Sequence, residues 1–335
     1  MSPTVDAIDV GYLGLDRAAA SFLVCAQGQP PILIECGTAA CQPRLHRALD
    51  ERGLRPADIA GLFVTHIHLD HAGGAGHFAA EGVPVYVHPF GVRHLADPSK
   101  LIASSRRVHG PSYDRFYGDP LPCPPQRLHA TPDGTVMRIA GLRVTAIETP
   151  GHARHHHAWL VEEDHPAPST ASIHHSRHLF TGDVASMRVP GSEFISVPMP
   201  PPEFDLAAWR HSLDRLTAAL RAGGETGETW TTLWLTHFGP ILGGSGQALA
   251  HIAEARRRLD AEAELVRGLV EEQDRGLSDT EAVARYGAWL WPQAAQAGVS
   301  EAQRSAFLGP SFCRMNLHGV RRWRDQVAAA ERAPG

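Results

Sequence analysis

Lysine is almost absent from this chain: Lys100 is the only one, and arginine supplies the rest of the 31 basic residues. Acidic residues number 36, so the formal net charge at pH 7 is −5, and no basic stripe compensates for it. Proteins that bind nucleic acids gather Lys and Arg on one face to contact phosphates. The sequence therefore predicts no nucleic-acid partner.

Long apolar runs are also missing. No stretch approaches the ~20 apolar residues that a membrane-spanning helix needs, and residues 1–6 lack the basic start and apolar stretch of a secretory signal. The cysteines are odd in number and contain no CxxC pair: Cys25, Cys36, Cys41, Cys123 and Cys313. Such cysteines are typical of free thiols in a reducing compartment. We therefore expect a cytoplasmic protein without a membrane span.

The chain has 335 residues, of which 43% are hydrophobic, so it can bury a large core. Residues 1–244 alternate short apolar strands with helical segments, which is typical of an α/β fold with functional loops at strand ends. From residue 245 the apolar spacing is helical, and it predicts three helices: Ala248–Val270, Ser278–Tyr286 and Asn316–Ala330. We expect an α/β domain over residues 1–244 and a helical region over residues 245–335.

Residues 90–132 differ from the rest of the first domain. They are rich in proline and glycine, cluster the aromatic residues Tyr113, Phe116 and Tyr117, and show no long periodic pattern. Long segments without regular structure usually have a function. We interpret this segment as a lid-like insertion or a pocket wall.

Residues 65–71, with the sequence THIHLDH, carry four metal-binding side chains directly after an apolar strand-like run. Alternate side chains of an extended segment point the same way, so His66 and His68 should project to one side. Asp70 and His71 come where a glycine-rich turn begins. Imidazole and carboxylate groups suit zinc and related divalent ions. The segment therefore predicts a metal site with a His pair and an Asp/His pair.

Four ligands on one loop do not complete two metal centres, so further ligands should follow later strands. Three segments repeat the arrangement of an apolar strand, a tight turn and one metal-binding side chain, and they supply His152, Asp183 and His237. Gly151 precedes the first of these residues and would let the backbone pass close to an ion. We predict that these three side chains are the remaining ligands.

The order HxHxDH, followed by His, Asp and His, resembles the metallo-β-lactamase superfamily over about residues 8 to 243. The resemblance implies a four-layer αβ/βα sandwich with a pair of metal ions between two sheets, followed here by the helical extension. The ligands that it implies fall into three groups: His66, His68 and His152 at one ion, Asp70, His71 and His237 at the other, and Asp183 bridging both.

The joint presence of Asp70, His71 and Asp183 resembles the glyoxalase II, lactonase and thioesterase branches of that family. The resemblance implies two divalent ions, with zinc favoured over iron or manganese, and a hydroxide held between them. Zinc lowers the pKa of bound water from about 15.7 to about 7. Our hypothesis is that this hydroxide cleaves an ester, thioester or lactone of a small molecule, with Asp183 and Asp70 as the catalytic residues and Asp70 moving a proton.

Two features depart from the patterns of that family. The motif usually written IDTG is Ile34-Glu35-Cys36-Gly37, so Glu35 stands where an aspartate would orient a ligand loop. The tyrosine that lactonases place between the bridging aspartate and the last histidine is missing from residues 184–236, so either Tyr113 or Tyr117 replaces it or the chemistry differs. In addition, the sequence has no lysine cluster that could bind a glutathione carboxylate, which weakens a strict glyoxalase II assignment.

Three other functions stay open at this point. A persulfide dioxygenase would hold a single iron at the first-site ligands, a phosphodiesterase could use the same metal pair, and a low-turnover regulatory protein could bind a ligand there. Oligomeric state is open as well. The remaining polar candidates are expected to lie away from the metal: His155–His157 facing outward, His178 as a solvated loop residue, and Asn316 on a helix surface.

Overall fold

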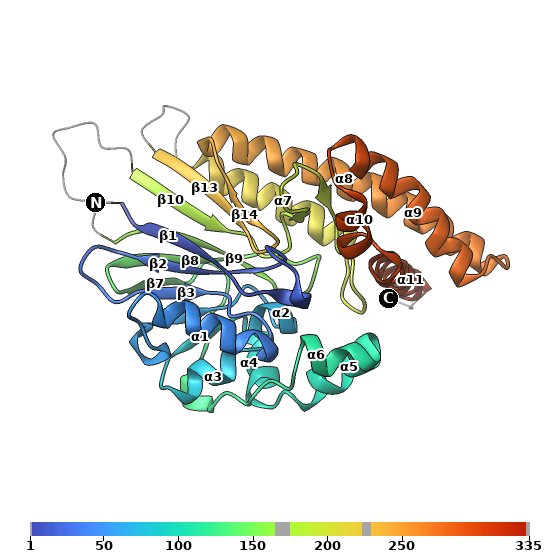
Figure 1. Cartoon of the computed structure of the whole chain (residues 1–335). Coiled ribbons are helices and arrows are strands. Elements are labelled where there is room, and N and C mark those ends of the chain that lie inside the picture. The colour runs from blue at the N-terminus through green and yellow to red at the C-terminus, as the bar shows by residue number, and fades with distance from the viewer. Residues whose placement is uncertain (1, 165–174, 223–228, 333–335) are drawn as a thin grey trace. The chain divides into compact units, whose positions relative to one another are not determined.

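The computed structural model describes residues 2–164, 175–222 and 229–332 (Figure 1). They form two compact units, each assembled from several segments of the chain. Unit 1 comprises Met1–Glu148, His155–Gly182 and Thr217–Ala248, and unit 2 comprises Thr149–Arg154, Asp183–Leu216 and Leu249–Gly335. The domain division between residues 244 and 245 stays a prediction.

Unit 1 contains two six-stranded sheets. The first has the strand order β1-β2-β3-β4-β5-β6, antiparallel from β1 to β3 and parallel from β3 to β6. Its strands are β1 (Thr4–Asp9), β2 (Ala20–Cys25), β3 (Ile32–Ile34), β4 (Leu62–Phe63), β5 (Val85–Val87) and β6 (Leu128–Ala130). Because β3, β4 and β5 are parallel, the residues that follow them emerge at the same edge of the sheet.

The second sheet has the strand order β14-β13-β10-β9-β8-β7, in which only the β10–β13 pair is parallel. Its strands are β7 (Val136–Ile139), β8 (Leu142–Glu148), β9 (His157–Glu163), β10 (His175–Phe180), β13 (Thr229–Leu235) and β14 (Gly239–Ile241). Along β8, Leu142, Val144 and Ala146 are buried and the residues between them are more exposed. This period of two is that of a strand with one face in a core.

The two sheets of unit 1 face each other, and helices cover the outer face of the first (Figure 1). Aromatic side chains fill the space between the sheets: Phe22, Phe63, Trp159, Phe180 and Trp234. The covering helices are α1 (Gln42–Asp50), α2 (Leu69–Ala72), α3 (Ala75–Ala80) and α4 (Pro89–Ala96). Their apolar side chains, among them Leu45, Leu49 and Phe78, pack with the outer face of the first sheet.

Residues 90–132 are largely helical, which contradicts the expectation of a long segment without regular structure. After α4 come α5 (Ser99–His109) and α6 (Tyr113–Phe116). Pro98 precedes α5, and Gly110, at φ +53°, ends it. Short helices interrupted by proline and glycine leave no long periodic pattern in the sequence. The role of this segment as a lid or pocket wall stays a prediction.

Unit 2 is mainly helical. Its elements are β11 (Met187–Arg188), β12 (Ile195–Ser196), the first part of α7 (Leu206–Arg221), most of α8 (Gly244–Asp274), α9 (Asp279–Gln296), α10 (Glu301–Phe307) and α11 (Pro310–Arg332). Ser278 caps α9, because its side chain accepts a hydrogen bond from the Glu281 N–H. The predicted helical character of the C-terminal region is confirmed.

The described helices include none that is both long and apolar enough to cross a membrane. All five cysteines are free thiols, which confirms that part of the prediction. Burial raises the pKa of the Cys36 thiol well above its usual range, and the thiol donates to the carbonyl of His71 at 3.3 Å. Cys36 therefore contributes packing beside the ligand loop.

His178 is buried in β10, so the prediction of a solvated loop residue was wrong. Its Nε2 donates to the Pro3 carbonyl at 3.2 Å, and its Nδ1 accepts from Trp234 Nε1 at 3.1 Å. Both ring nitrogens are thus used by the neutral form of the ring. Burial lowers the pKa of His178 from 6.5 to about 4.

We expect His178 to destabilise the folded protein in acid. A pKa that is lower in the folded chain than in the unfolded one makes stability complete above pH 6.5 and progressively lower down to about pH 4. The loss corresponds to about 3 kcal/mol at 1.36 kcal/mol per unit. Urea unfolding of His178→Gln should therefore show a shallower pH dependence between pH 6.5 and 4 than the wild type. His129→Gln, at an exposed position, should behave like the wild type, and equal slopes for His178→Gln would contradict the prediction.

Candidate metal centre

The ligand loop, residues 65–71, follows β4 and runs into α2. His66 and His68 lie before the helix, with His66 Nε2 2.8 Å from His68 Nδ1. Asp70 and His71 lie in the first turn of α2. The strand end and the helix start therefore present two neighbouring pairs of donor side chains.

Glu35 connects this loop to neighbouring strand ends through hydrogen bonds. Its fully buried carboxylate accepts hydrogen bonds from the Thr65 N–H at 3.2 Å, the Thr65 hydroxyl at 2.6 Å and the Thr236 hydroxyl at 3.3 Å. Its Oε1 also lies 3.0 Å from His71 Nδ1. Glu35 follows β3, Thr65 follows β4 and Thr236 follows β13, so one carboxylate ties three strand ends from both sheets of unit 1.

The tautomers of two histidines follow from these contacts. His237 Nδ1 lies 2.6 Å from the Ala18 carbonyl, which can only accept, so Nδ1 carries the proton and Nε2 keeps its lone pair. His71 Nδ1 donates to Glu35 in the same way. The two Nε2 atoms lie 3.3 Å apart, so two acceptors face each other when both rings are neutral. An arrangement of this kind is stable when positive charge lies between them.

Asp70 adds a third acceptor to this pair. Its Oδ2 lies 3.5 Å from His237 Nε2 and 3.8 Å from His71 Nε2. The three side chains offer ligand atoms that all lie within 4.8 Å of one another. Two imidazoles whose other nitrogen is held by a carboxylate or a carbonyl, together with one carboxylate, are ligands that a divalent ion such as zinc prefers. This set of residues fits a metal ion.

His66 is also oriented by Glu35, through the Thr65 hydroxyl. The Thr65 hydroxyl donates to Glu35, so it accepts from His66 Nδ1 at 3.1 Å. The unprotonated Nε2 of His66 then points to His68 Nδ1. Thr65 and Glu35 therefore decide which nitrogen of His66 is available to a metal. Neither Thr65 nor Thr236 was identified from the sequence, because a threonine after a strand has no distinctive pattern.

The remaining two predicted ligands lie together in unit 2. His152 Nε2 is 3.2 Å from Asp183 Oδ2, and both residues are buried. His152 Nδ1 donates to the Pro198 carbonyl at 3.0 Å, which directs Nε2 toward the carboxylate. Five predicted ligands thus gather in unit 1, and two in unit 2.

Trp209, on α7, supports both unit 2 ligands. Its ring stands edge-on to His152, with centroids 5.6 Å apart, and its Nε1 donates to the Val184 carbonyl at 2.6 Å. Gly151, at φ +132°, packs against Trp209, because a Cβ at this glycine would lie 2.3 Å from Trp209 Cα. Close packing against a helix, rather than the passage of an ion, therefore explains Gly151.

The prediction that His155–His157 face outward was wrong, since all three are buried. The His156 ring lies 4.9 Å from the His66 ring, and the backbone N–H of His157 donates to the Thr65 carbonyl at 2.7 Å. The first five residues of β9 are buried whichever face they lie on. A strand covered on both faces has no polar alternation, so the sequence could not distinguish this triplet from an exposed one.

The two candidate tyrosines have different surroundings. Tyr113 packs under the Arg106 guanidinium, 4.4 Å from the ring centre, and burial raises the pKa of Tyr113 to about 12. The Tyr117 hydroxyl lies 2.6 Å from the Tyr12 hydroxyl, and the Tyr12 ring lies 6.1 Å from the His237 ring. Burial, together with the charge of nearby Asp70, raises the pKa of Tyr117. Of the two tyrosines, Tyr117 is therefore the one that is linked, through Tyr12, to the donor set of Asp70, His71 and His237.

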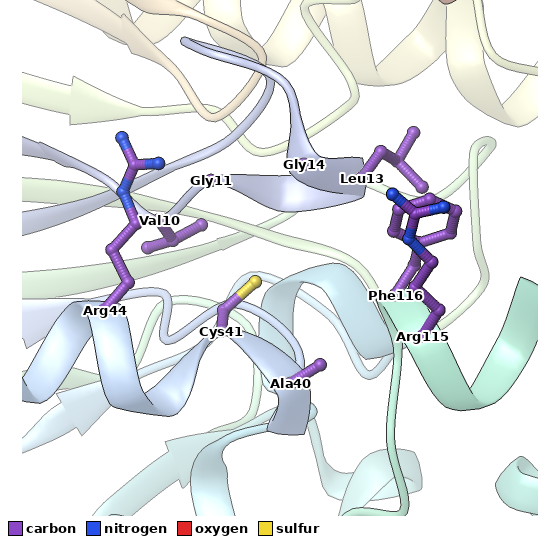
Figure 2. Close-up of a pocket in the computed structure, with 9 residues that line it drawn as sticks. All are labelled: Val10, Gly11, Leu13, Gly14, Ala40, Cys41, Arg44, Arg115 and Phe116. Carbon is purple, nitrogen blue, oxygen red and sulfur yellow. The ribbon is translucent and has the colours of Figure 1, made fainter.

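Unit 1 also contains a pocket of about 210 Å³ that none of the seven predicted ligands lines (Figure 2). Its lining residues come from the connection between β1 and β2, the 3-10 turn before α1 (Ala39–Cys41), α1 and α6: Val10, Gly11, Leu13, Gly14, Ala40, Cys41, Arg44, Arg115 and Phe116. Figure 2 shows Arg44 and Arg115 at opposite ends, with Cys41 between them. Arg44 is already paired with Asp9 at 2.8 Å. We assign no ligand to this pocket.

Comparison with known proteins now identifies the family. A family model described as the metallo-beta-lactamase superfamily matches residues 14–226 of this chain. The chain belongs to the metallo-β-lactamase superfamily. The fold class and the family predicted from the ligand order are thereby confirmed. Members of this superfamily are mostly metal-dependent hydrolases.

Solved structures agree with this assignment. The metallo-beta-lactamase family protein TTHA1429 from Thermus thermophilus aligns with a TM-score of 0.63 at 21% identity, over 98% of this chain and 94% of that one. The archaeal superfamily protein ST1585 from Sulfolobus tokodaii aligns with a TM-score of 0.55 at 21% identity, over 75% of this chain and 85% of that one. At this level of identity the likeness shows the fold.

Curated relatives match over shorter stretches. The metallo-beta-lactamase fold-containing protein ST1585 of Sulfurisphaera tokodaii is 28% identical over 162 residues, which is 46% of this chain and 54% of that protein. The lactamase-like protein notP of Aspergillus sp. is 23% identical over 174 residues, which is 52% of this chain and 37% of that protein. The match thus spans about half or less of these relatives.

Proposed function

We propose that this chain is a hydrolase with two divalent metal ions, zinc by preference, that cleaves an ester, thioester or lactone of a small molecule. The observation that carries the proposal is the set of facing acceptors in unit 1. His71 and His237 turn unprotonated nitrogens toward each other and toward Asp70, and each ring is held in that tautomer by a buried partner. Pure packing gives no reason for three acceptors to converge.

Chain connectivity supports joining the two unit 2 ligands to this set. Gly182, the residue before Asp183, lies against the ligand loop, since a Cβ there would be 2.5 Å from Thr65 Oγ1 and 2.6 Å from His156 Nε2. Asp183 follows Gly182 directly in the chain, and consecutive Cα atoms are about 3.8 Å apart. His152 likewise precedes the buried triplet by only three residues in the chain.

The proposed centre uses all seven predicted ligands, with one group for each ion and a bridging carboxylate: His66, His68 and His152; Asp70, His71 and His237; and Asp183. When bound, such ions make water acidic enough to lose its proton near neutral pH and polarise a carbonyl group. An unprotonated Nε2 is needed for this, and the hydrogen bonds that the two unit 1 rings donate from Nδ1 to Glu35 and Ala18 orient Nε2 away from these partners.

Asp70 is the most exposed member of its donor set, with 18% of its side chain exposed, against 9% for His237 and 0% for His71. A substrate can therefore approach its carboxylate, which can take up a proton and pass it to the leaving group. The Tyr117 and Tyr12 hydroxyls stand on this side and can donate a hydrogen bond to a substrate oxygen. The five free thiols suit a reducing cytoplasmic setting.

Elemental analysis of the purified full chain, together with a panel of esters, thioesters, lactones and phosphodiesters, tests the proposal. We expect about two equivalents of zinc per chain and turnover of one of the first three classes, both lost on treatment with a chelator. His129→Ala, which removes an exposed histidine from β6, should leave both unchanged. One equivalent of iron with oxygen-dependent oxidation of a persulfide, cleavage of phosphodiesters alone, or the absence of metal would each overturn the proposal.

A further inference from the structure

A backbone carbonyl contributes to the orientation of His152. The ring donates from Nδ1 to the carbonyl oxygen of Pro198, and this contact decides where Nε2 points. Pro198 lies in the connection between β12 and α7, where no sheet ladder or helix holds the backbone. Something else must fix the position of this carbonyl if His152 is to be held in one orientation.

Asn316, on α11, holds the residues on both sides of Pro198. Its Oδ1 accepts from the Met199 N–H at 2.7 Å, and its Nδ2 donates to the Val197 carbonyl at 2.8 Å. The side chain is fully buried, so the expectation that Asn316 lies on a helix surface was wrong. One amide group thus binds the peptide units on both sides of Pro198, and the second of these contains the carbonyl bonded to His152.

Asn316 is itself fixed by a buried polar network from three helices. Its Nδ2 also lies 2.9 Å from the Tyr286 hydroxyl, which donates to Glu262 Oε2 at 2.8 Å. The Arg258 guanidinium donates to Glu262 Oε1 at 3.0 Å. We call these four residues, all buried, the tail network. They lie on α8, α9 and α11 of unit 2.

A second contact brings the same helix onto the loop. Gly319 is three residues after Asn316 and therefore shares its face of α11. A Cβ at Gly319 would lie 1.9 Å from the Met199 carbonyl oxygen and 2.8 Å from its carbon. The helix backbone approaches the loop so closely that only glycine fits. Asn316 and Gly319 are thus two adjacent points at which α11 contacts the loop.

Stability alone does not explain the tail network. Removing a charged pair and a polar amide from water is costly, and apolar packing of the same volume is often at least as stabilising. A fully connected polar network does, however, define one geometry sharply. Here Asn316, at one end of the tail network, binds the two peptide groups beside Pro198. The network therefore ends at the backbone segment that orients a predicted ligand.

We propose that Asn316 is a positioning residue for His152, and that the C-terminal helices orient this ligand through the Pro198 carbonyl. The inference rests on the proposed function, because it takes His152 as a metal ligand. Substitution of a group that holds a metal-binding histidine typically lowers metal affinity about 10- to 100-fold. That change should affect one of the two ions and leave the other unchanged.

Cobalt(II) titration of the apo full chain, followed by its visible absorption, tests this inference. For Asn316→Ala we expect two binding steps, one weakened about 10- to 100-fold and with an altered spectrum. Asn316→Asp keeps the acceptor for Met199 but faces the Val197 carbonyl with an oxygen, so it should also be weakened. Gly319→Ala should weaken the same step, because it pushes the helix off the loop.

Leu269→Ala is the matched control, since Leu269 is buried on α8 outside the tail network. It should lower the unfolding temperature as Asn316→Ala does, yet keep wild-type affinity and spectrum. Wild-type cobalt binding by Asn316→Ala, or equal weakening by Leu269→Ala, would overturn the positioning role and leave the proposed function standing. A wild-type chain that binds no cobalt would overturn both.

Discussion

Replacing Asp183 by Asn should abolish turnover and reduce bound metal from about two ions to one or none per chain. The substitution keeps size and shape but removes the buried negative charge 3.2 Å from His152 Nε2. The stabilisation that a metal pair gives a hydrolytic transition state is several kcal/mol, and each 1.36 kcal/mol is tenfold in rate, so activity should fall by about 10³-fold or more. Steady-state kinetics and elemental analysis of the same sample measure both effects.

Asp16→Asn serves as the control for this prediction, because Asp16 is 92% exposed and is not one of the predicted ligands. It should retain full activity and full metal content. If Asp183→Asn kept two equivalents of metal and turned over at the wild-type rate, Asp183 could not be a shared ligand.

Glu35→Gln should disturb the centre without removing any ligand. An amide at this position accepts fewer hydrogen bonds than a carboxylate and presents an NH₂ group to donors from Thr65, Thr236 or His71. The mismatch should cost about 1–3 kcal/mol of folding stability, because buried donors then lack acceptors. Loss of the carboxylate behind His71 should also weaken metal binding about 10- to 100-fold.

Denaturant unfolding and metal titration of Glu35→Gln measure these two losses, with Glu81→Gln at an exposed position as the control. A variant with wild-type stability and wild-type affinity would show that Glu35 does not hold the ligand loop. Loss of stability with unchanged affinity would limit Glu35 to tying the three strand ends together.

The site was predictable as far as local chemistry reached. Four metal-binding side chains after one strand, and one more after each of three later strands, predict seven ligands. The structure places five of these residues in unit 1 and two in unit 2. The order of these ligands was also enough to predict the family. Both features are carried by short segments, whose spacing relative to a strand end is legible in the sequence.

Residues that act at long range were harder to assess. The motif places Glu35 only where an aspartate would orient a ligand loop, whereas its contacts with Thr65, His71 and Thr236 join strand ends up to 201 residues apart. Asn316 was assigned to a helix surface, although it bonds backbone groups about 120 residues earlier in the chain. A single polar residue in a helix looks the same whether it faces water or a buried carbonyl.

The amino-acid sequence by itself was enough to predict the seven candidate ligands, their order and the fold family, because metal affinity is a property of residue type and strand ends are a property of local pattern. The tertiary structure alone decided how the rings of His237, His71 and His152 are oriented, since that depends on partners such as Ala18, Glu35 and Pro198. Two of these partners are backbone carbonyls, which every residue possesses, so no residue type could reveal them.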